Sequence, residues 1–151
     1  MIPLDPIQIY RARGCSRQWQ GFVRAMAAEF AAELPPRELA TLMARIGQRF
    51  AREHPLRGCA SLAEVEGEAN RVWSDSDWGG CRMVERADCV EILHAAAPIS
   101  VVLEGAEWGD GFLEGVYEGW FQQLGMLAGL AVMAGEPRSG DLRCFRLARR
   151  A

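Results

Sequence analysis

The spacing of the apolar residues changes at Gly79-Gly80, and this change limits the folds that the chain can adopt. Before the two glycines, apolar residues recur every three or four positions, which is typical of helices that bury one face. After them, apolar and polar residues alternate over short runs, which is typical of half-buried strands. The change predicts an α+β fold in which helices come first and a sheet follows.

Three helices are predicted ahead of the glycines. The first begins after Ser16. Its apolar stripe consists of Trp19, Phe22, Val23, Met26, Ala27 and Phe30. Pro35-Pro36 ends this helix and starts a second one, which stops at His54-Pro55. The third opens at Ser61 with a Ser-x-x-Glu capping box and ends at the polar cluster 75–77.

A hairpin, a long helix and a second hairpin are predicted in the remainder. The first hairpin covers 81–93, the helix runs from Asp110 to about Leu124, and the second hairpin covers 127–147. Residues 98–109 fit either a loop or an extension of the strand region, because they include the apolar run Ile99-Ser100-Val101-Val102-Leu103. These elements predict a four-stranded antiparallel sheet packed against helices on one side.

Residues 1–15 match neither period, and two prolines interrupt them. We expect an extended N-terminal arm at 1–15, followed by a single α+β domain at 16–151. Five large apolar residues lie in the arm: Ile2, Leu4, Ile7, Ile9 and Tyr10. An apolar arm is seldom left in water, so we expect it to pack on its own domain or on a neighbouring copy.

Composition argues against several classes of protein. A net charge of −3 gives no positive field to attract nucleic acid. No apolar run approaches the roughly 20 residues that cross a bilayer, and the N-terminus does not resemble an export signal. Five cysteines at scattered spacings fit a reducing compartment, with each thiol a small buried hydrophobe. We therefore expect no nucleic-acid partner, no direct membrane span and a cytoplasmic location.

One pair of carboxylates suggests chemistry. Glu114 and Glu118 lie one helical turn apart, at roughly the separation that a retaining glycosidase uses. Alternatively, Glu114 is stabilised near a helix N-terminus and Glu118 belongs to a solvated face. We favour this alternative, because glycosidase carboxylates usually come from separate strands or loops around a cleft. The chain is therefore predicted not to be an enzyme.

The two histidines do not belong to a metal-binding motif. His54 fits the end of a helix beside a proline. His94 has Cys81 and Cys89 nearby, which could imply zinc or haem ligation, but residues on one hairpin alternate faces. No cofactor is predicted. A small sensor domain that binds lipid or haem between its helices and sheet is the competing hypothesis.

Glycines recur every four residues along the long helix, where each costs about 1 kcal/mol relative to alanine. A glycine ridge lets another backbone come close, either inside the domain or across a symmetry axis, and aromatic neighbours supply packed area. Both arrangements can hold at once. The candidates for self-association are Gly111, Gly115, Tyr117, Gly119 and Trp120.

Three motifs resemble a known family, the D subunit of the bacterial cellulose synthase complex. They are Leu113-Glu114-Gly115-Val116-Tyr117-Glu118-Gly119-Trp120, which is similar to the family's Leu-Glu-Gly-x-Tyr-x-x-Trp stretch, the helix end formed by Gly47, Ala51, Pro55 and Leu56, and Asp77-Trp78-Gly79 before the first strand. The similarity runs from about Trp19 to Trp120. Three motifs in the correct order are much more specific than any one alone.

The resemblance implies a non-catalytic accessory subunit that forms a ring-like homo-oligomer, an octamer built from dimers, and helps organise the export and crystalline bundling of β-1,4-glucan. The implied partners are the cellulose synthase complex, a proline-rich cellulose-crystallisation protein and the glucan itself. The arm residues Ile2, Pro3, Leu4 and Asp5 are the implied candidates for lining glucan passages or subunit contacts. The basic C-terminal end, with Arg143, Arg146, Arg149 and Arg150, departs from the family pattern.

Overall fold

The computed structural model describes residues 15–125, 129–136 and 141–150. In chain order, the elements are α2 (Arg17–Glu33), α3 (Pro36–Glu53), α4 (Leu62–Asp75), β1 (Gly80–Glu85), β2 (Val90–Ala95), α5 (Pro98–Val102), the 3-10 helix η1 (Glu107–Asp110), α6 (Gly111–Gln123), β3 (Leu130–Ala134) and β4 (Leu142–Arg149). The predicted α+β order of helices, hairpin, long helix and second hairpin is confirmed. The capping box is present as well, because the Ser61 hydroxyl accepts the Glu64 backbone N–H.

The segment 98–109 differs from both sequence-based alternatives, since it contains α5 and η1 and no strand. Ala96 has a positive φ of 63°, which ends β2 before the apolar run begins. Pro98 then occupies the first turn of α5, where its fixed φ favours a helix. The β-branched composition of 99–102 is therefore misleading.

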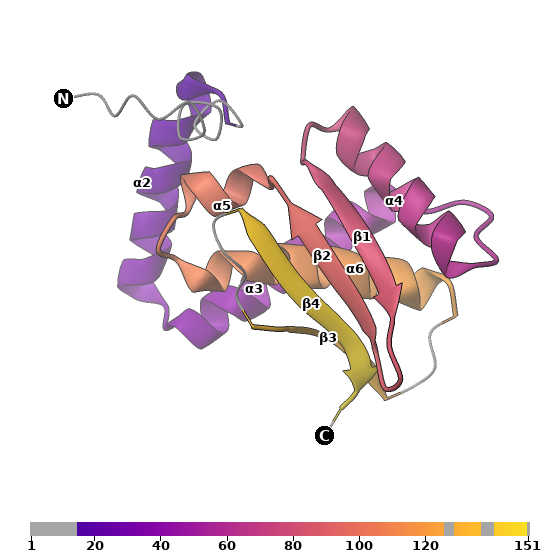
Figure 1. Ribbon diagram of the computed structural model, residues 1–151. Helices are drawn as coiled ribbons and strands as arrows, with labels where there is room; N and C mark the ends of the chain where they lie inside the picture. Colours follow the sequence, from indigo (N-terminus) through magenta and orange to yellow (C-terminus); the bar gives the residue numbers. More distant parts are fainter. Residues whose placement is uncertain (1–14, 126–128, 137–140, 151) are drawn as a thin grey trace.

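The four strands form one antiparallel sheet in the order β1-β2-β4-β3. Figure 1 shows α3 and α6 together on one side of this sheet. Side chains that alternate along the strands reach the helices from Ile92 and His94 in β2 and from Phe145 and Leu147 in β4, and all four are buried. The core thus lies between the sheet and α6.

Glycines bring α3 and α6 into backbone contact. A Cβ atom at Gly115 would overlap the carbonyl oxygen of Ala44 in α3, and one at Gly111 would lie 2.5 Å from that of Ala40. Gly47 makes the reciprocal approach from α3 to α6. This contact compensates for the low helix propensity of glycine, so the ridge serves packing within the chain.

A chain of hydrogen bonds links three fully buried side chains. Trp73 Nε1 donates to the Tyr117 hydroxyl at 3.1 Å, and this hydroxyl lies 2.6 Å from His94 Nδ1. His94 Nε2 lies 2.8 Å from the Trp78 carbonyl, which can only accept, so Nε2 carries the proton and Nδ1 accepts from Tyr117. Burial lowers the pKa of His94 to about 4, and the ring is neutral.

The first helix is held weakly to the rest of the chain. It begins after Ser16 as predicted, but the Ser16 side chain makes no capping hydrogen bond. Only Ala27 of α2 is buried. Three large apolar residues of its stripe are exposed, with fractions of 56% for Trp19, 60% for Phe22 and 40% for Met26. The apolar face of α2 is therefore largely uncovered within one chain.

We predict that Gly115→Ala lowers the free energy of unfolding by about 2–3 kcal/mol, because the new methyl group forces α3 and α6 apart. Gly67→Ala is the matched control in α4, where a Cβ meets nothing within 4 Å, and it should stabilise by about 0.5–1 kcal/mol. Urea unfolding of both variants measures the difference. Equal effects of the two substitutions would contradict the close helix contact.

The His94 network predicts a loss of stability in acid. Since the pKa of His94 falls from 6.5 to about 4 on folding, the unfolded chain takes up the proton first. The contribution of neutral His94 to the free energy of unfolding is complete above pH 6.5. It declines as the pH falls towards 4, by a total of about 3 kcal/mol.

His94→Gln isolates this contribution, because glutamine can accept and donate hydrogen bonds but does not titrate. The difference in unfolding free energy between the native protein and this variant should shrink between pH 6.5 and 4. His54→Gln, at an exposed position, is the control. A difference that is constant with pH would show that His94 does not gain its proton on unfolding.

Candidate functional site

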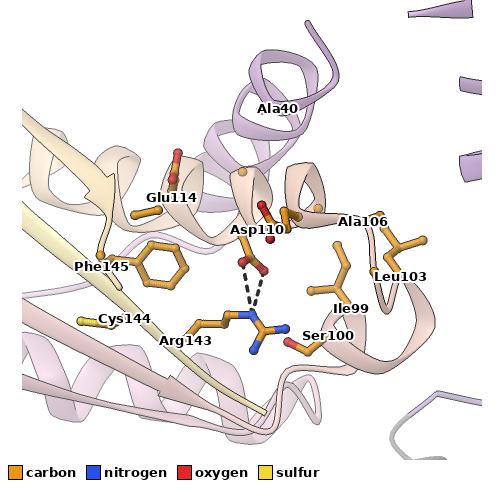
Figure 2. A pocket seen from close by; sticks show the side chains of 16 residues that line it. Ala40, Ile99, Ser100, Leu103, Ala106, Asp110, Glu114, Arg143, Cys144 and Phe145 are labelled. Carbon is orange, nitrogen blue, oxygen red and sulfur yellow. Dashed lines mark hydrogen bonds and ion pairs between the residues drawn. The ribbon is translucent and has the colours of Figure 1, made fainter. Parts of the chain in front are cut away.

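A cavity of about 510 Å³ lies where α5, η1 and the first turn of α6 meet the C-terminal strands. We call it the α5–α6 cavity. Figure 2 shows Ile99 and Ser100 on one side of it, Asp110 and Glu114 on another, and Arg143 across from them. Its size is within the range of small-molecule sites, and it combines apolar walls with convergent polar groups.

Local structure explains why these polar groups converge. Asp110 is the N-cap residue of α6 and Glu114 lies one turn further on, so both occupy the same face of the helix start. Arg143 has the same parity along β4 as Phe145, whose side chain is buried, and it therefore points towards the helices. Pro98 starts α5 and thereby places Ser100 at the wall.

Charge is partly compensated in the cavity. Arg143 Nε lies 3.2 Å from both Oδ1 and Oδ2 of Asp110. Burial nevertheless raises the pKa of Asp110, outweighing the opposite effect of Arg143. Burial also raises the pKa of Glu114, although the Ala134 backbone N–H donates to this carboxylate. These carboxyl groups are therefore poorly solvated. Because they line the cavity, a ligand that enters it can contact them.

In the part of the chain that the structure describes, Ser100 has the only buried polar side-chain atom without a hydrogen-bond partner. Its side chain is 4% exposed, and Oγ has no hydrogen-bond partner among the described residues. In Figure 2 its oxygen points towards the Arg143 guanidinium. An unpaired buried hydroxyl costs about 1–3 kcal/mol, so its position requires an explanation.

The proposed glycosidase pair is not assembled in this cavity. Glu114 lines it, whereas Glu118 does not. Glu118 Oε1 instead lies 3.8 Å from Arg150 Nη2. Among the described residues, the carboxylate that joins Glu114 at the wall from the same helix start is Asp110, which is held by Arg143.

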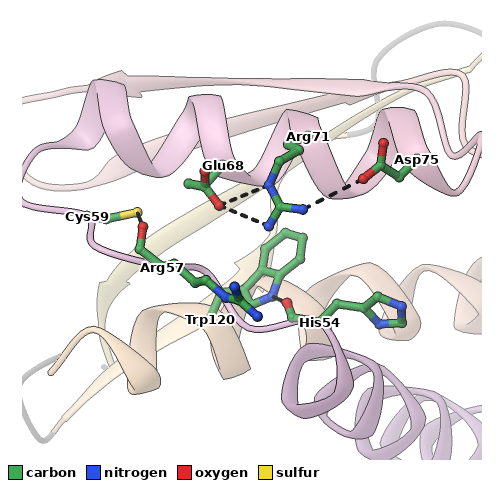
Figure 3. A network of polar contacts seen from close by, with 7 residues as sticks. All are labelled: His54, Arg57, Cys59, Glu68, Arg71, Asp75 and Trp120. Carbon is green, nitrogen blue, oxygen red and sulfur yellow. Dashed lines mark hydrogen bonds and ion pairs between the residues drawn. The ribbon is translucent and has the colours of Figure 1, made fainter.

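A second polar cluster lies between the end of α3 and α4 (Figure 3). Arg71 bridges Glu68 at 3.0 Å and Asp75 at 3.7 Å, but Asp75 is exposed and Glu68 partly exposed, so these ion pairs contribute little to stability. The His54 ring stacks on Phe50 and lies 3.0 Å from the Phe50 carbonyl, which confirms its place at a helix end. Among residues 15–125, 129–136 and 141–150, no three His, Cys, Asp or Glu side chains could together hold a metal ion.

The structure describes the predicted self-association residues of α6 but not the predicted contact residues of the arm. Ile2, Pro3, Leu4 and Asp5 lie outside the described residues. The self-association candidates Gly111, Gly115, Tyr117, Gly119 and Trp120 are all buried within the chain, in contact with α3, α4 or the sheet. Packing within the chain is therefore observed, and a role for these five residues in self-association stays a prediction.

Sequence reasoning missed Ser100 and the pairing of Asp110 with Arg143. The sequence pattern groups Arg143 with the basic C-terminal end, yet its alternation with buried β4 residues is a usable signal that it faces the helices. Ser100 gives no such signal, because one serine in an apolar run fits a loop, a strand or a helix equally well.

Comparison with known proteins places the chain in a family. The model of a family described as the D subunit of cellulose synthase matches residues 6–143, a longer stretch than the three motifs span. No individually curated protein matches the chain. The fold resembles subunit 3 of the trafficking protein particle complex from Naegleria fowleri, solved covalently bound to palmitic acid, with a TM-score of 0.56, 8% identity, and coverage of 90% of this chain and 98% of that one.

The structural likeness at this low identity concerns the fold alone. In the part of the chain that the structure describes, no helix is long and apolar enough to cross a bilayer. The family match, in contrast, covers most of the sequence and includes the three motifs singled out above. The chain belongs to the family of cellulose synthase D subunits.

Proposed function

We propose that the chain is a non-catalytic accessory subunit of a bacterial cellulose synthase complex, acting as a homo-oligomeric scaffold for the export and bundling of β-1,4-glucan. Family membership supports the link to cellulose synthesis. The observation that carries the scaffold role is the uncovered apolar face of α2, which includes Trp19, Phe22 and Met26. Large exposed apolar patches on soluble proteins commonly mark interaction sites.

The occupant of this face is a second copy of the chain. Trp19 and Phe22 form an edge-to-face pair, with ring centroids 6.0 Å apart, so the two rings offer one continuous apolar surface to a partner. Figure 1 shows α2 at one end of the molecule, away from the sheet, where a second copy could approach it. Burying a large apolar side chain contributes about 1.5–3 kcal/mol. In a dimer with two-fold symmetry, both copies would bury the same side chains and the contribution would double.

The oligomer is an octamer built from dimers, and the arm adds to its contacts. Because residues 1–15 directly precede α2, Ile2, Pro3, Leu4 and Asp5 can reach the region of the proposed interface or line passages for glucan. The further partners in this proposal are the synthase complex and a proline-rich cellulose-crystallisation protein, on the cytoplasmic side of the membrane.

Several features support a role without catalysis. Asp110 is engaged by Arg143, and Glu118 does not join Glu114 at the cavity. Burial raises the pKa of Cys81 to about 11, so its thiol is a poor nucleophile.

The lipid or haem alternative is less well supported. Charged groups line the α5–α6 cavity, which disfavours an acyl chain. Both ring nitrogens of His94 are engaged in hydrogen bonds and could not bind iron without breaking them. The α5–α6 cavity is therefore poorly suited to an acyl chain such as palmitic acid.

We predict that replacing Trp19 and Phe22 together by Glu dissolves the oligomer, because two charges would have to be buried at the interface. Light scattering at micromolar concentration should report a multiple of 16.7 kDa for the native chain and about 16.7 kDa for the variant. The matched control is Ala25→Glu with Ala32→Glu, which adds equal charge at exposed positions outside the stripe. A monomeric native chain would refute the scaffold.

The same variants test the role in cells. In a strain that lacks the native chain, the control should restore crystalline cellulose, whereas the Trp19 and Phe22 variant should not. Synthesis of glucan by isolated membranes should be equal in both strains, because polymerisation resides in another subunit. Loss of polymerisation with the variant would contradict an accessory role.

A further inference from the structure

The unpaired Ser100 hydroxyl is the most informative feature outside the proposed interface. It is 4% exposed and lies in the wall of the α5–α6 cavity. A hydroxyl group both donates and accepts a hydrogen bond, so two interactions are unmade at this buried position. A ligand in the cavity that offers a polar group to Ser100 would recover this free energy.

The other polar groups restrict the chemistry of that ligand. Glu107, Asp110 and Glu114 supply three carboxyl groups, whereas Arg143 supplies one guanidinium. An excess of carboxylates repels phosphate and carboxylate ligands. An ammonium group would be attracted by the carboxylates, but it has only donors and could accept neither the Ser100 hydroxyl hydrogen nor a guanidinium N–H of Arg143.

A neutral group with several hydroxyls meets each requirement. Glu114 is an acceptor, and the Ala134 N–H occupies only one of its roughly four lone-pair positions. Ser100 provides both a donor and an acceptor. Ile99 and Leu103 add apolar wall that a sugar ring can cover with its C–H groups.

We propose that the α5–α6 cavity is a binding site for a neutral polyhydroxyl ligand, of the size of one or a few sugar rings, with Ser100 and Glu114 as its hydrogen-bonding contacts. This site is separate from the α2 face and does not depend on the proposed scaffold role. It gives the chain a direct contact with carbohydrate through Glu114 and through Ser100, which no sequence motif indicated.

Calorimetric titration of the full chain at neutral pH tests the proposal with four probes: cellotetraose, maltotetraose, inorganic phosphate and putrescine. At least one tetrasaccharide should bind, and phosphate and putrescine should not. Preference for cellotetraose would identify β-1,4-glucan as the source of the sugar, and equal binding of both would identify sugars in general. No heat with either sugar up to about 20 mM, or binding of phosphate or putrescine in its place, would overturn the proposal.

Single substitutions test whether the sugar binds in the α5–α6 cavity. Ser100→Ala should weaken sugar binding about fivefold, which is the usual effect of one lost hydrogen bond, while leaving the melting temperature of the ligand-free protein unchanged or higher. Ser74→Ala, at an exposed serine in α4, should change neither. Glu114→Ala should also weaken sugar binding about fivefold, because it removes the acceptor that Glu114 offers to the ligand.

Unchanged affinity in Ser100→Ala would overturn the assignment. Absence of sugar binding in a protein that still forms its oligomer would overturn this inference alone. A monomeric protein that binds sugar through Ser100 would count against the scaffold alone.

Discussion

The contact between α3 and α6 through their glycines determines most of the remaining structure. Because Gly47, Gly111 and Gly115 lack a side chain, the two helix backbones touch, and α6 becomes a central layer between α3 and the sheet. Buried side chains cover nearly every side of α6, so its aromatic residues can reach in different directions. Tyr117 thereby meets His94 of the sheet and Trp73 of α4, and Trp120 donates to the His54 carbonyl at the end of α3. A side chain at the glycines would shift all these contacts together.

The same contact fixes the position of the α5–α6 cavity. With α6 held against α3, its N-terminal turn projects towards β4, where Arg143 meets Asp110. Helix α5 then closes the side of the cavity, because Pro98 turns the chain into a helix directly after β2. The carboxyl groups are positioned by the rigid core and not by a loop, which suits a site that selects a ligand by geometry. Carboxylates near a helix N-terminus are also stabilised by the helix dipole, so they cost the fold less there than elsewhere.

Periodicity predicted the helices and hairpins because each buries one face, and the α+β class followed directly. It failed at 98–102, where the residues fitted a loop or a strand while Pro98 and the positive φ of Ala96 produced a helix. It also could not tell which apolar faces the chain covers itself. The glycine ridge of α6 was predicted as a self-association surface and the stripe of α2 was not, yet the ridge is filled by α3 and the stripe is largely exposed. Periodicity identifies an apolar face but not its occupant.

Helix α2 shows how assembly and folding would be coupled in the proposed scaffold. It has no side-chain cap, no acidic residue in its first turn and no basic residue in its last, and only Ala27 anchors it by burial. A helix of 17 residues with so few supports is close to the length at which isolated helices are marginal in water. Burial of Trp19, Phe22 and Met26 against a second copy would supply the missing stabilisation, so α2 would be most stable in the oligomer. Stability of this helix should then rise with protein concentration, whereas the α3–α6 core, which is complete within one chain, should not respond to it.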